Sequence, residues 1–479
     1  MKVDLSNIRC YLCVRTTVRY FSTVFLFIML MTACRKEQFF NGKVQLSLAA
    51  DTVWFDTVFT RQPGSTYPIS VTQITWIKNP ETLPVKASVR LAGGKQSAYR
   101  INVDGMAGPV VEDLEIPARD SVFVFVQCSL EANGQTGPAL VLDSLLIENN
   151  GNQQKMLLGA YGWDAHYFRS ASLPCGGVWD DQVKPYVIID NALVPAGCNF
   201  TIKEGVKVYC SARSTFFVAG NLQIQGTAQQ RVLFTGDKPG YNARYFPNQW
   251  VGLRFGIGSA GNNIRYADIQ NAAIGIRVDS LPVGQPENLH LENTKVQYCG
   301  QACLAGITAH ISAENCLFGQ AGSYSFLGLL GGKYRFTHCT FATYVNYATR
   351  QDGHFAITNT LRDGNGNILA TAPLECNTYN SVIYGSLQEE LLVDKGGSAT
   401  FTTDFSGNLI KSKSKPFLAT LNKYNLDPRF KDETGGNFAP DTLSPLRNAG
   451  ILLSQPVTID VDGKPRIGVP DIGAFERPD

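Results

Sequence analysis

The chain has 479 residues, of which 44% are hydrophobic, so it is long enough for two or three domains with sizeable cores. Its formal net charge is only +2, and no dense stripe of Lys and Arg runs along it. Because nucleic-acid binding depends on such a stripe, this composition argues against nucleic acid as a partner.

The N-terminus has the composition of an export signal. Basic residues precede an apolar run at 21–31, and the small residues Thr32 and Ala33 lead directly to Cys34. The run is too short to cross a bilayer comfortably, which favours a signal peptide over a transmembrane helix. A Cys at this place resembles the lipid-attachment site of bacterial lipoproteins, which implies that Cys34 becomes the first mature residue and carries the lipid. The alternative is a simple secretory signal with an incidental Cys.

A polar tether at 34–43 leads into an all-β segment at 44–165 that has no long period. Short runs of β-branched and aromatic residues are separated by turn signals, which are Asn79-Pro80, Gly93-Gly94, Asp104-Gly105, Asn133-Gly134 and Asn149-Asn150-Gly151. About seven short strands over roughly 115 residues predict an Ig-like β-sandwich. Only Cys128 lies in this segment, so the disulfide of antibody-type domains is not expected.

A strand-like unit then recurs within the segment at 166–410. Aligned on one position, its copies begin at Tyr266, Asn293, Asn315, His338 and Asn380. They lie 27, 22, 23 and 42 residues apart, and the last spacing fits two turns or one turn with an insertion. A period in the twenties, with β-branched and aromatic residues between Gly and Asn, predicts a right-handed parallel β-helix.

Within such a coil, inward positions are apolar and outward positions are mostly polar. Ile269, Val296 and Phe318 are therefore predicted to stack inward, with Lys295 facing solvent. The Asn residues that share one register predict either a ladder of bonded side-chain amides or a turn at that corner, since Asn suits both.

The cysteines give no sign of a metal site. Of the 12 Cys, Cys10, Cys13 and Cys34 fall in the signal and lipid site, which leaves an odd nine that cannot all pair. Cys316 and Cys339 share the repeat position, which favours small apolar fillers stacked in the coil. The pair at 299 and 303 has no second pair close by, and a structural zinc needs four ligands. We therefore expect no metal and no cofactor.

A loop that interrupts the coil before Trp250 is the best binding candidate. It carries Asp237, Tyr241, Arg244 and Tyr245. Aromatic faces stack on sugar rings, and Arg and Asp side chains hydrogen-bond to hydroxyl groups. The alternative is that these aromatic residues fold back over a wall of the coil, and this is the expectation for Trp250.

No catalytic set is apparent along the repeat. A lyase of this fold needs clustered carboxylates that hold Ca²⁺ beside a basic side chain, and a hydrolase needs carboxylates across a sugar-sized gap. Asp268, Lys295 and Glu314 lie near comparable register but form no dense carboxylate cluster. The sequence therefore leaves catalytic residues unassigned.

The segment at 411–479 is predicted to be the last part of the coil with its cap. Asp460, Asp462 and Asp471 lie there with Arg466, and they either hold Ca²⁺ or form a salt-bridged cap over the open end. The Asp-x-Asp-Gly run lacks the remaining ligands of a Ca²⁺ loop, which favours the cap.

Several short motifs mark the mature chain: DTVWFDTVFT at 51–60, RINVDG at 100–105, YGWDA at 161–165, FTGDK at 234–238, QWVG at 249–252 and DIGA at 471–474. Together they resemble a family of uncharacterised lipoproteins from Bacteroidota, over most of the mature chain. The resemblance implies an outer-membrane lipoprotein with an Ig-like domain before a β-helix of the pectate-lyase-like superfold. It brings no established catalytic residues.

We therefore expect a non-catalytic lipoprotein of the outer membrane or cell surface. It would bind glycan or another envelope component through its β-helix, with the membrane reached through the N-terminal lipid. One alternative is a polysaccharide lyase or glycoside hydrolase acting on acidic polysaccharide, and another is a structural adhesin. The expected segments are a signal at 1–33, a tether at 34–43, a sandwich at 44–165, a β-helix at 166–410 and a final part with its cap at 411–479.

Overall fold

The computed structural model describes residues 38–60, 72–132, 134, 137–237, 245–279, 287–417 and 421–477. The expectations for the signal peptide, Cys34, Tyr241 and Arg244 lie outside these residues. The chain divides into two compact units. The first consists of Met1–Trp54, Thr72–Cys128 and Leu142–Gly159. The second consists of Phe55–Val71, Ser129–Val141 and Ala160–Asp479. Across the described ranges, no helix is long and apolar enough to cross a membrane.

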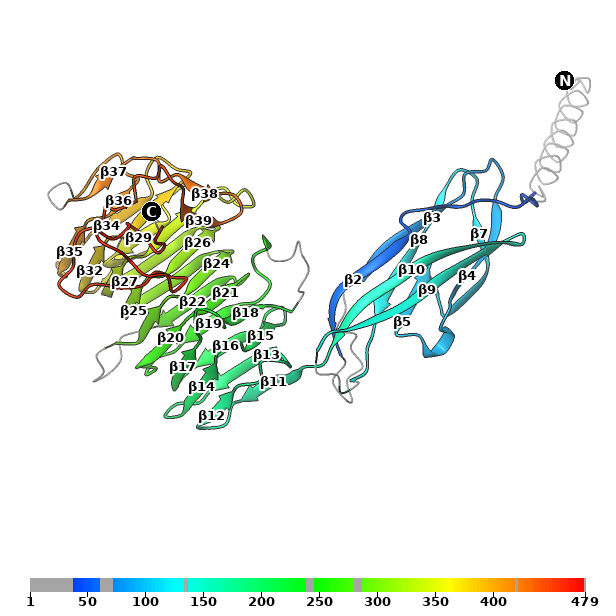
Figure 1. Ribbon diagram of the computed structural model, residues 1–479, viewed down its shortest axis with the longest axis horizontal. Helices are drawn as coiled ribbons and strands as arrows, with labels where there is room; N and C mark the ends of the chain where they lie inside the picture. Colours follow the sequence, from blue (N-terminus) through cyan, green and yellow to red (C-terminus); the bar gives the residue numbers. More distant parts are fainter. Residues whose placement is uncertain are drawn as a thin grey trace, which may run out of the picture. The chain divides into compact units, whose positions relative to one another are not determined.

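The first unit is built on two five-stranded sheets (Figure 1). One sheet runs in the order β1 (Ser47–Leu48), β3 (Gln73–Lys78), β8 (Ser121–Cys128), β5 (Tyr99–Val103) and β6 (Met106–Ala107). The other runs in the order β2 (Thr52–Phe59), β10 (Asn152–Trp163), β9 (Ala139–Asn149), β4 (Val85–Leu91) and β7 (Val110–Ile116), with the short helix η1 (Gly94–Gln96) after β4. The pairings β3–β8, β5–β8, β4–β7 and β4–β9 are antiparallel.

Alternating side chains give the first unit its core. Val122, Val124 and Val126 of β8 are fully buried or nearly so, and Ile147 and Met156 are buried on the other sheet. The Thr75 hydroxyl donates to Met156 Sδ at 3.8 Å, which joins the two sheets through their inner faces. The two sheets therefore share one core, as in a β-sandwich. The Ig-like topology of this unit stays a prediction.

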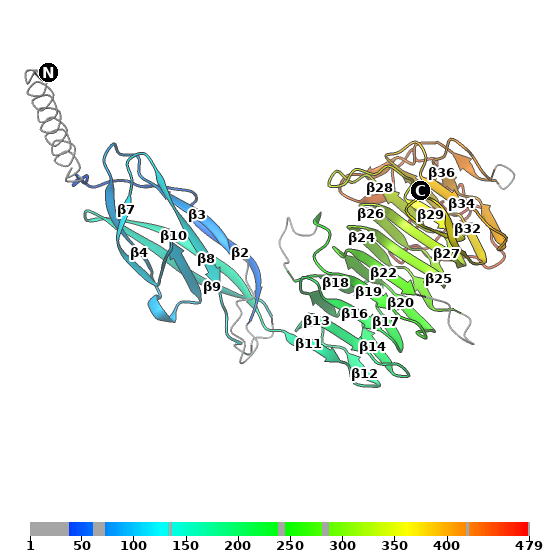
Figure 2. The ribbon, with the colours of Figure 1, turned by 180° about the vertical axis from the view of Figure 1, so that it is seen from behind.

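The second unit is a parallel β-coil with three walls, and its strands stack in chain order (Figure 2). It begins with β11 (His166–Ser172) and β13 (Tyr186–Val194). Wall 1 consists of β15 (Lys207–Cys210), β18 (Val232–Gly236), β21 (Ala267–Gln270), β24 (Lys295–Cys299), β26 (Leu317–Ala321), β28 (Thr340–Thr343), β33 (Val382–Gly385), β36 (Leu409–Ile410) and β37 (Lys423–Tyr424).

Walls 2 and 3 share two long strands that turn a corner, β25 (Ala302–Glu314) and β27 (Tyr324–Thr337). Wall 2 also contains β16 (Thr215–Val218), β19 (Gly252–Phe255), β22 (Ile274–Asp279), β29 (Phe355–Thr358) and β34 (Leu391–Asp394). Wall 3 also contains β12 (Gly177–Trp179), β14 (Asn199–Lys203), β17 (Asn221–Gln225), β20 (Asn262–Arg265), β23 (Leu289–Glu292), β32 (Leu374–Tyr379) and β35 (Phe401–Ser406).

The predicted stacking of the repeat is confirmed. Ile269 pairs with Val296, Val296 with Phe318, Phe318 with Phe341, and Phe341 with Ile383 on successive rungs of wall 1. All five side chains are fully buried in one continuous core. Parallel pairing through every rung establishes the β-helix, while the right-handed sense of the coil stays a prediction.

The 42-residue spacing is one turn with an insertion. Strand β28 pairs directly with β33, and Thr340 lies opposite Val382. The extra residues include the antiparallel hairpin of β30 (Thr360–Arg362) and β31 (Ile368–Thr371). The insertion therefore leaves the wall 1 register intact.

The position on which the repeat was aligned is a corner with left-handed backbone. It is occupied by Tyr266, Asn293, Asn315, His338 and Asn380, with φ of 48°, 51°, 51°, 51° and 49°. Asn tolerates this conformation, which supports the corner interpretation. The ladder interpretation holds between Asn315 and Asn293, where Nδ2 donates to Oδ1 at 3.4 Å, and Asn380 Nδ2 likewise lies 3.1 Å from His338 Nε2 on the neighbouring rung.

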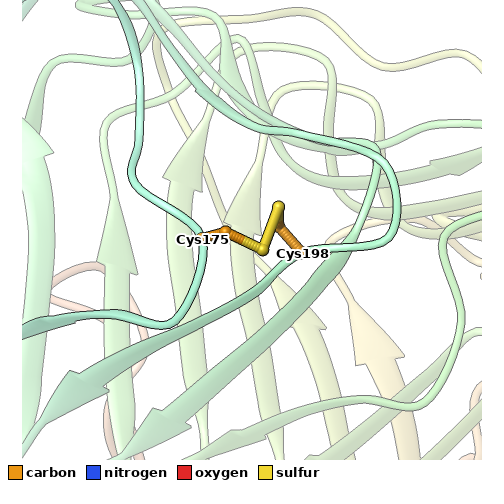
Figure 3. The surroundings of a disulfide bond; sticks show 2 residues. All are labelled: Cys175 and Cys198. Atoms are coloured by element: carbon orange, nitrogen blue, oxygen red, sulfur yellow. A yellow bond between two sulfur atoms is a disulfide. The ribbon is translucent and has the colours of Figure 1, made fainter.

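Cys175 and Cys198 form a disulfide between adjacent turns of the coil (Figure 3). Gly177 of β12 pairs with Phe200 of β14. Cys175 and Cys198 each lie two positions before this pair, so they are level with each other on adjacent turns. Seven other described cysteines are buried and form no disulfide, among them Cys316 and Cys339 in the coil core as predicted.

A segment at 427–477, here called the C-terminal strap, packs against the outside of wall 1 and contains β38 (Phe430–Asp432) and β39 (Asn437–Pro440). Phe438, Leu446 and Ile472 of the strap pack with Leu317 and Val382 of the coil in a second hydrophobic cluster. The expectation of a polar, solvated outer face is therefore wrong for this part of wall 1.

The strap also corrects two residue-level predictions. Lys295 does not simply face solvent, because its ammonium lies 2.6 Å from Asp462 Oδ1. The acidic residues with Arg466 do not cover the open end, because Arg466 Nη2 donates to Asn315 Oδ1 at 2.8 Å on the side of the coil. The last rungs are covered instead by Phe417, whose ring stacks on Phe405 at 4.3 Å.

Candidate ligand-binding clefts

The strap and wall 1 enclose a cleft of about 370 Å³, here called the tyrosine cleft. Four tyrosines line it: Tyr245, Tyr298, Tyr344 and Tyr347. The other lining residues are Gln320, Val345, Asn346, Asp432, Thr434 and Gly435. The tyrosines come from the loop before wall 2, from β24 and from the turn after β28, so the coil brings together residues that are far apart in sequence.

Hydrogen bonds hold the Tyr298 and Tyr347 rings in place, and a ring contact holds Tyr245. The Tyr298 hydroxyl donates to the Gly435 carbonyl at 2.8 Å, and the Tyr245 ring meets the Tyr298 ring edge-on at 5.5 Å. The Tyr347 hydroxyl donates to the Gln320 carbonyl at 2.6 Å. Because the rings are fixed before any ligand arrives, binding on them would cost little ordering of side chains.

Tyr347 offers the most accessible of the four rings. It is 38% exposed, whereas Tyr298 is buried. Burial raises the pKa of the Tyr344 and Tyr347 phenols above the usual range, so both stay protonated at neutral pH. The cleft thus combines ring faces with neutral hydroxyl groups.

A second cleft of about 450 Å³ adjoins the first and shares Tyr245, Tyr298 and Gly435 with it. The cations Lys431 and Lys464 line this cleft and are exposed. Neither lysine has an ion-pair partner within the described residues. Across the two adjoining clefts, the lining therefore changes from aromatic to cationic.

The structure brings one of the four predicted binding residues into the tyrosine cleft. Tyr245 lines it, whereas Asp237 follows β18, donates its amide to the Cys210 carbonyl at 3.0 Å and does not line the cleft. Tyr241 and Arg244 lie outside the described residues. Trp250 is buried in the coil and donates its indole N–H to the Gln270 carbonyl at 2.8 Å, which confirms the packing interpretation.

A third cleft of about 430 Å³ lies on wall 3. The lining residues are Glu287, His290, His310, Ser312, Ala313, Glu314, Lys333, Arg335, Thr337, Glu375, Asn377 and Gln455. Most come from outward positions of β23, β25, β27 and β32, which the parallel register stacks in rows. This cleft is here called the wall 3 cleft.

Ser312 lies at the centre of a hydrogen-bonded group in the wall 3 cleft. Its hydroxyl donates to Glu287 Oε1 at 2.5 Å and lies 2.6 Å from His290 Nδ1. The Glu287 carboxylate, 3.7 Å from His290 Nδ1, raises the pKa of His290, and the same contact helps to lower the pKa of Glu287 against the opposing effect of burial.

Glu314 is the unsatisfied group of the wall 3 cleft. Its side chain is half-buried and has neither a hydrogen bond nor an ion pair within the described residues. Burial raises its pKa, and so does the neighbouring carboxylate of Glu292, which itself pairs with Arg265 at 3.4 Å. A carboxyl group in such a place can carry a proton at higher pH than usual.

The acidic side chains of the strap accept hydrogen bonds from backbone amides of the strap itself. Asp460 Oδ1 accepts from the amides of Asp462 and Lys464 at 2.9 and 2.8 Å, and its Oδ2 accepts from the Glu476 amide at 2.9 Å. Asp471 likewise accepts from the amides of Asn448 and Arg477. Within the described part of the chain, no group of three or more His, Cys, Asp or Glu side chains is arranged to hold a metal ion.

Comparisons with known proteins complete the description. No family model matches the chain, and no curated protein matches it. Among solved structures, the pectate lyase Pel9A covers 66% of this chain and 88% of its own, with 12% identity and a TM-score of 0.28. The E. coli chaperone DraB covers 25% of this chain and 55% of its own, with 9% identity and a TM-score of 0.17. Both likenesses are distant, so the assignment of the coil rests on its own strand pairings.

Proposed function

We propose that the protein is a lipid-anchored protein of the outer membrane whose coil binds glycan in the tyrosine cleft. The observation that carries this proposal is the convergence of four tyrosines on one cleft of about 370 Å³. In this proposal the first unit is an Ig-like spacer, and the second is a right-handed β-helix that presents the cleft.

The chemistry of the cleft supports a sugar better than a purely apolar ligand. Aromatic faces stack on the C–H faces of sugar rings, while hydroxyl and amide groups at the rim bond to sugar hydroxyls. Tyr347 supplies an exposed ring, and Asn346 and Thr434 supply polar groups beside it. A structural adhesin would need the same strap contacts but no open ring face.

A glycan array probed with the chain from Arg35 onward tests the proposal. We expect retention of at least one class of oligosaccharide, and loss of that signal in Tyr347→Ala because the stacking surface is removed. Tyr161→Ala is the matched control, since Tyr161 is similarly exposed at 41% and lies outside the cleft. Absence of binding to every glycan would favour the structural adhesin.

The wall 3 cleft supports a second candidate function, hydrolysis of a glycoside. The specific observation is that Glu314, which has no bonded side-chain partner within the described residues, lines the same cleft as Glu287, and that the environments of these two carboxyl groups shift their pKa values in opposite directions. Protonated Glu314 would give its proton to the leaving oxygen, while ionised Glu287 would take a proton from the water that attacks the anomeric carbon. The glycosidic C–O bond breaks, a new C–O bond forms, and water is the only co-reactant.

Release of reducing ends from polysaccharides tests this second candidate. Glu314→Gln should reduce the rate by 100-fold or more, on the order expected for loss of a general acid. Because Glu314 must be protonated, the rate should fall as the pH rises through its raised pKa. Glu204→Gln, a change outside the cleft, is the control. Equal rates in Glu314→Gln and the wild type would remove this candidate.

The lipid anchor has its own test. Metabolic labelling with a palmitate analogue should tag the wild-type chain and leave Cys34→Ala unlabelled, because only the thiol can accept the diacylglyceryl group. The alternative, a simple secretory signal, predicts that neither chain is labelled and that both are released. Equal labelling of the two chains would contradict attachment at Cys34.

A further inference from the structure

The second cleft, of about 450 Å³, has more cationic than anionic side chains in its lining, and we call it the lysine cleft. Three lysines line it, which are Lys295, Lys431 and Lys464, against the single carboxylate of Asp462. Lys295 and Asp462 form an ion pair at 2.6 Å, so these two charges offset each other. The charges of Lys431 and Lys464 therefore remain.

These two lysines extend from backbone that is held by hydrogen bonds. The Lys464 amide donates to Asp460 Oδ1 at 2.8 Å, and its carbonyl accepts from the Asp460 amide at 2.8 Å. Lys431 is the middle residue of β38, whose two other residues, Phe430 and Asp432, pair with β39. Both lysine side chains are exposed, and neither has an ion-pair partner within the described residues. Their ammonium groups are therefore available to an anionic ligand.

The carboxylates next to these lysines along the chain do not offset them in the cleft. Asp432 lines the tyrosine cleft instead, as expected for neighbouring residues of a strand, and its Oδ1 accepts from the Gly435 amide at 2.9 Å. Glu433 lines neither cleft, and burial raises its pKa. Asp460 is fully buried, and its two oxygens accept from backbone amides. The unpaired charge in the lining of the lysine cleft is therefore positive.

The two clefts are continuous, because Tyr245, Tyr298 and Gly435 line both of them. Their volumes of about 370 and 450 Å³ each lie in the lower part of the range of about 300–1,000 Å³ that is usual for ligand sites. An oligosaccharide that stacks on Tyr347 would therefore reach the lysine cleft with a neighbouring sugar residue.

We propose that the glycan bound at the tyrosine cleft is anionic, and that a carboxylate or sulfate on one of its sugar residues lies between Lys431 and Lys464. An ammonium group binds either anion as a point charge, so the chemistry that the two anions share is what the cleft selects. The net charge of the whole chain is only +2, so a preference for anionic glycans would come from this cleft rather than from general attraction. This inference rests on the proposed function, since the tyrosine cleft holds the rest of the glycan.

Matched pairs of oligosaccharides, probed with the chain from Arg35 onward, test the class of the ligand. Each pair consists of a uronate oligosaccharide and the same compound with its carboxyl groups reduced to alcohols, or of a sulfated oligosaccharide and its desulfated form. In at least one pair we expect the anionic member to bind about fivefold more tightly or better, the effect of two partly screened ion pairs. The kind of pair that responds distinguishes carboxylate from sulfate. Added salt should reduce the preference, because it screens exposed charges.

Lys431→Gln with Lys464→Gln should lower the affinity for the anionic member to that for its neutral counterpart. The matched control is Lys413→Gln with Lys415→Gln, which removes two exposed lysines of the same compact unit that line neither cleft. All four substituted side chains are exposed, so thermal melts of both double variants should stay near the wild type.

Equal affinity for both members of every pair, or equal weakening in the two double variants, would overturn this inference. Tyr347→Ala separates it from the proposed function. Weakening by Tyr347→Ala without weakening by the change at Lys431 and Lys464 would keep the glycan site and remove its anionic class. The reverse result would keep the anionic class and remove the tyrosine cleft, and no binding to any oligosaccharide would overturn both.

Discussion

Val296→Asp is expected to destabilise the coil by about 4 kcal/mol or more. Val296 is fully buried between Ile269 below and Phe318 above, so its side chain has no route to water. A carboxylate there would either remain charged and unpaired or take up a proton, and both outcomes cost free energy. Urea melts should show the midpoint falling sharply, or the protein should fail to fold.

Val251→Asp is the matched control for this change. It is the same substitution in the same coil, but Val251 is 41% exposed, and its effect should stay within about 0.5 kcal/mol. Lys295→Asp is not a neutral control, because it would place a second carboxylate beside Asp462. If Val251→Asp unfolds the protein and Val296→Asp leaves it intact, the rung register is wrong.

Arg466→Met is expected to cost about 3–5 kcal/mol in the stability of the strap on the coil. The Arg466 side chain is buried, and its guanidinium lies 3.0 Å from Glu476 and donates to the carbonyl of Gly473 and to Asn315 Oδ1, both at 2.8 Å. Removing it leaves the Glu476 carboxylate buried without its partner. A Lys ammonium cannot form the same set of hydrogen bonds as the planar guanidinium, so Arg466→Lys should restore only part of the lost stability.

Limited proteolysis would report this loss directly. Cleavage within the strap should appear in Arg466→Met while the coil remains resistant. The control is Arg429→Met in the same strap, where the pair with Asp441 is partly exposed and its loss should have little effect. A strap that stays resistant in Arg466→Met would contradict the role given to this residue.

The coil could be predicted from the sequence because its causes are local. Each rung repeats a corner residue that tolerates left-handed backbone, such as Asn293 and Asn315, followed by an inward apolar residue such as Val296 or Phe318. Stacking of like residues then follows from parallel pairing at a fixed period. The corner position was visible even where His338 replaces Asn.

The outer face of wall 1 could not be predicted in the same way. Leu317 and Val382 point away from the coil core but are buried beneath Phe438 and Ile472 of the strap. The strap has no period, and it begins 110 residues after Leu317 and 45 residues after Val382. Nothing in the local pattern around Leu317 indicates which distant segment would cover it, so the contact depends on tertiary packing alone.

The tyrosine cleft could be predicted from the sequence only in part, for the same reason. Tyr245 could be predicted as a binding residue because it lies in a loop rich in aromatic residues. Tyr298 and Tyr347 lie in separate turns, and their cleft exists only because the strap brings Gly435 to the Tyr298 hydroxyl. Asp237 is near Tyr245 in sequence but does not line the cleft, since its amide bonds to the Cys210 carbonyl at the end of the neighbouring strand β15.

Isothermal titration of the glycan selected on the array tests the central claim most directly, because it measures whether the tyrosine cleft is where that glycan binds. The account predicts saturable binding by the wild type, at least tenfold weaker binding by Tyr347→Ala, and wild-type affinity in Tyr161→Ala. Far-ultraviolet circular dichroism and melts should show that all three chains are equally folded, since both substituted rings are partly exposed. If Tyr347→Ala keeps the wild-type affinity, glycan binding cannot be assigned to this cleft. This holds whether Tyr161→Ala binds more weakly or neither variant does.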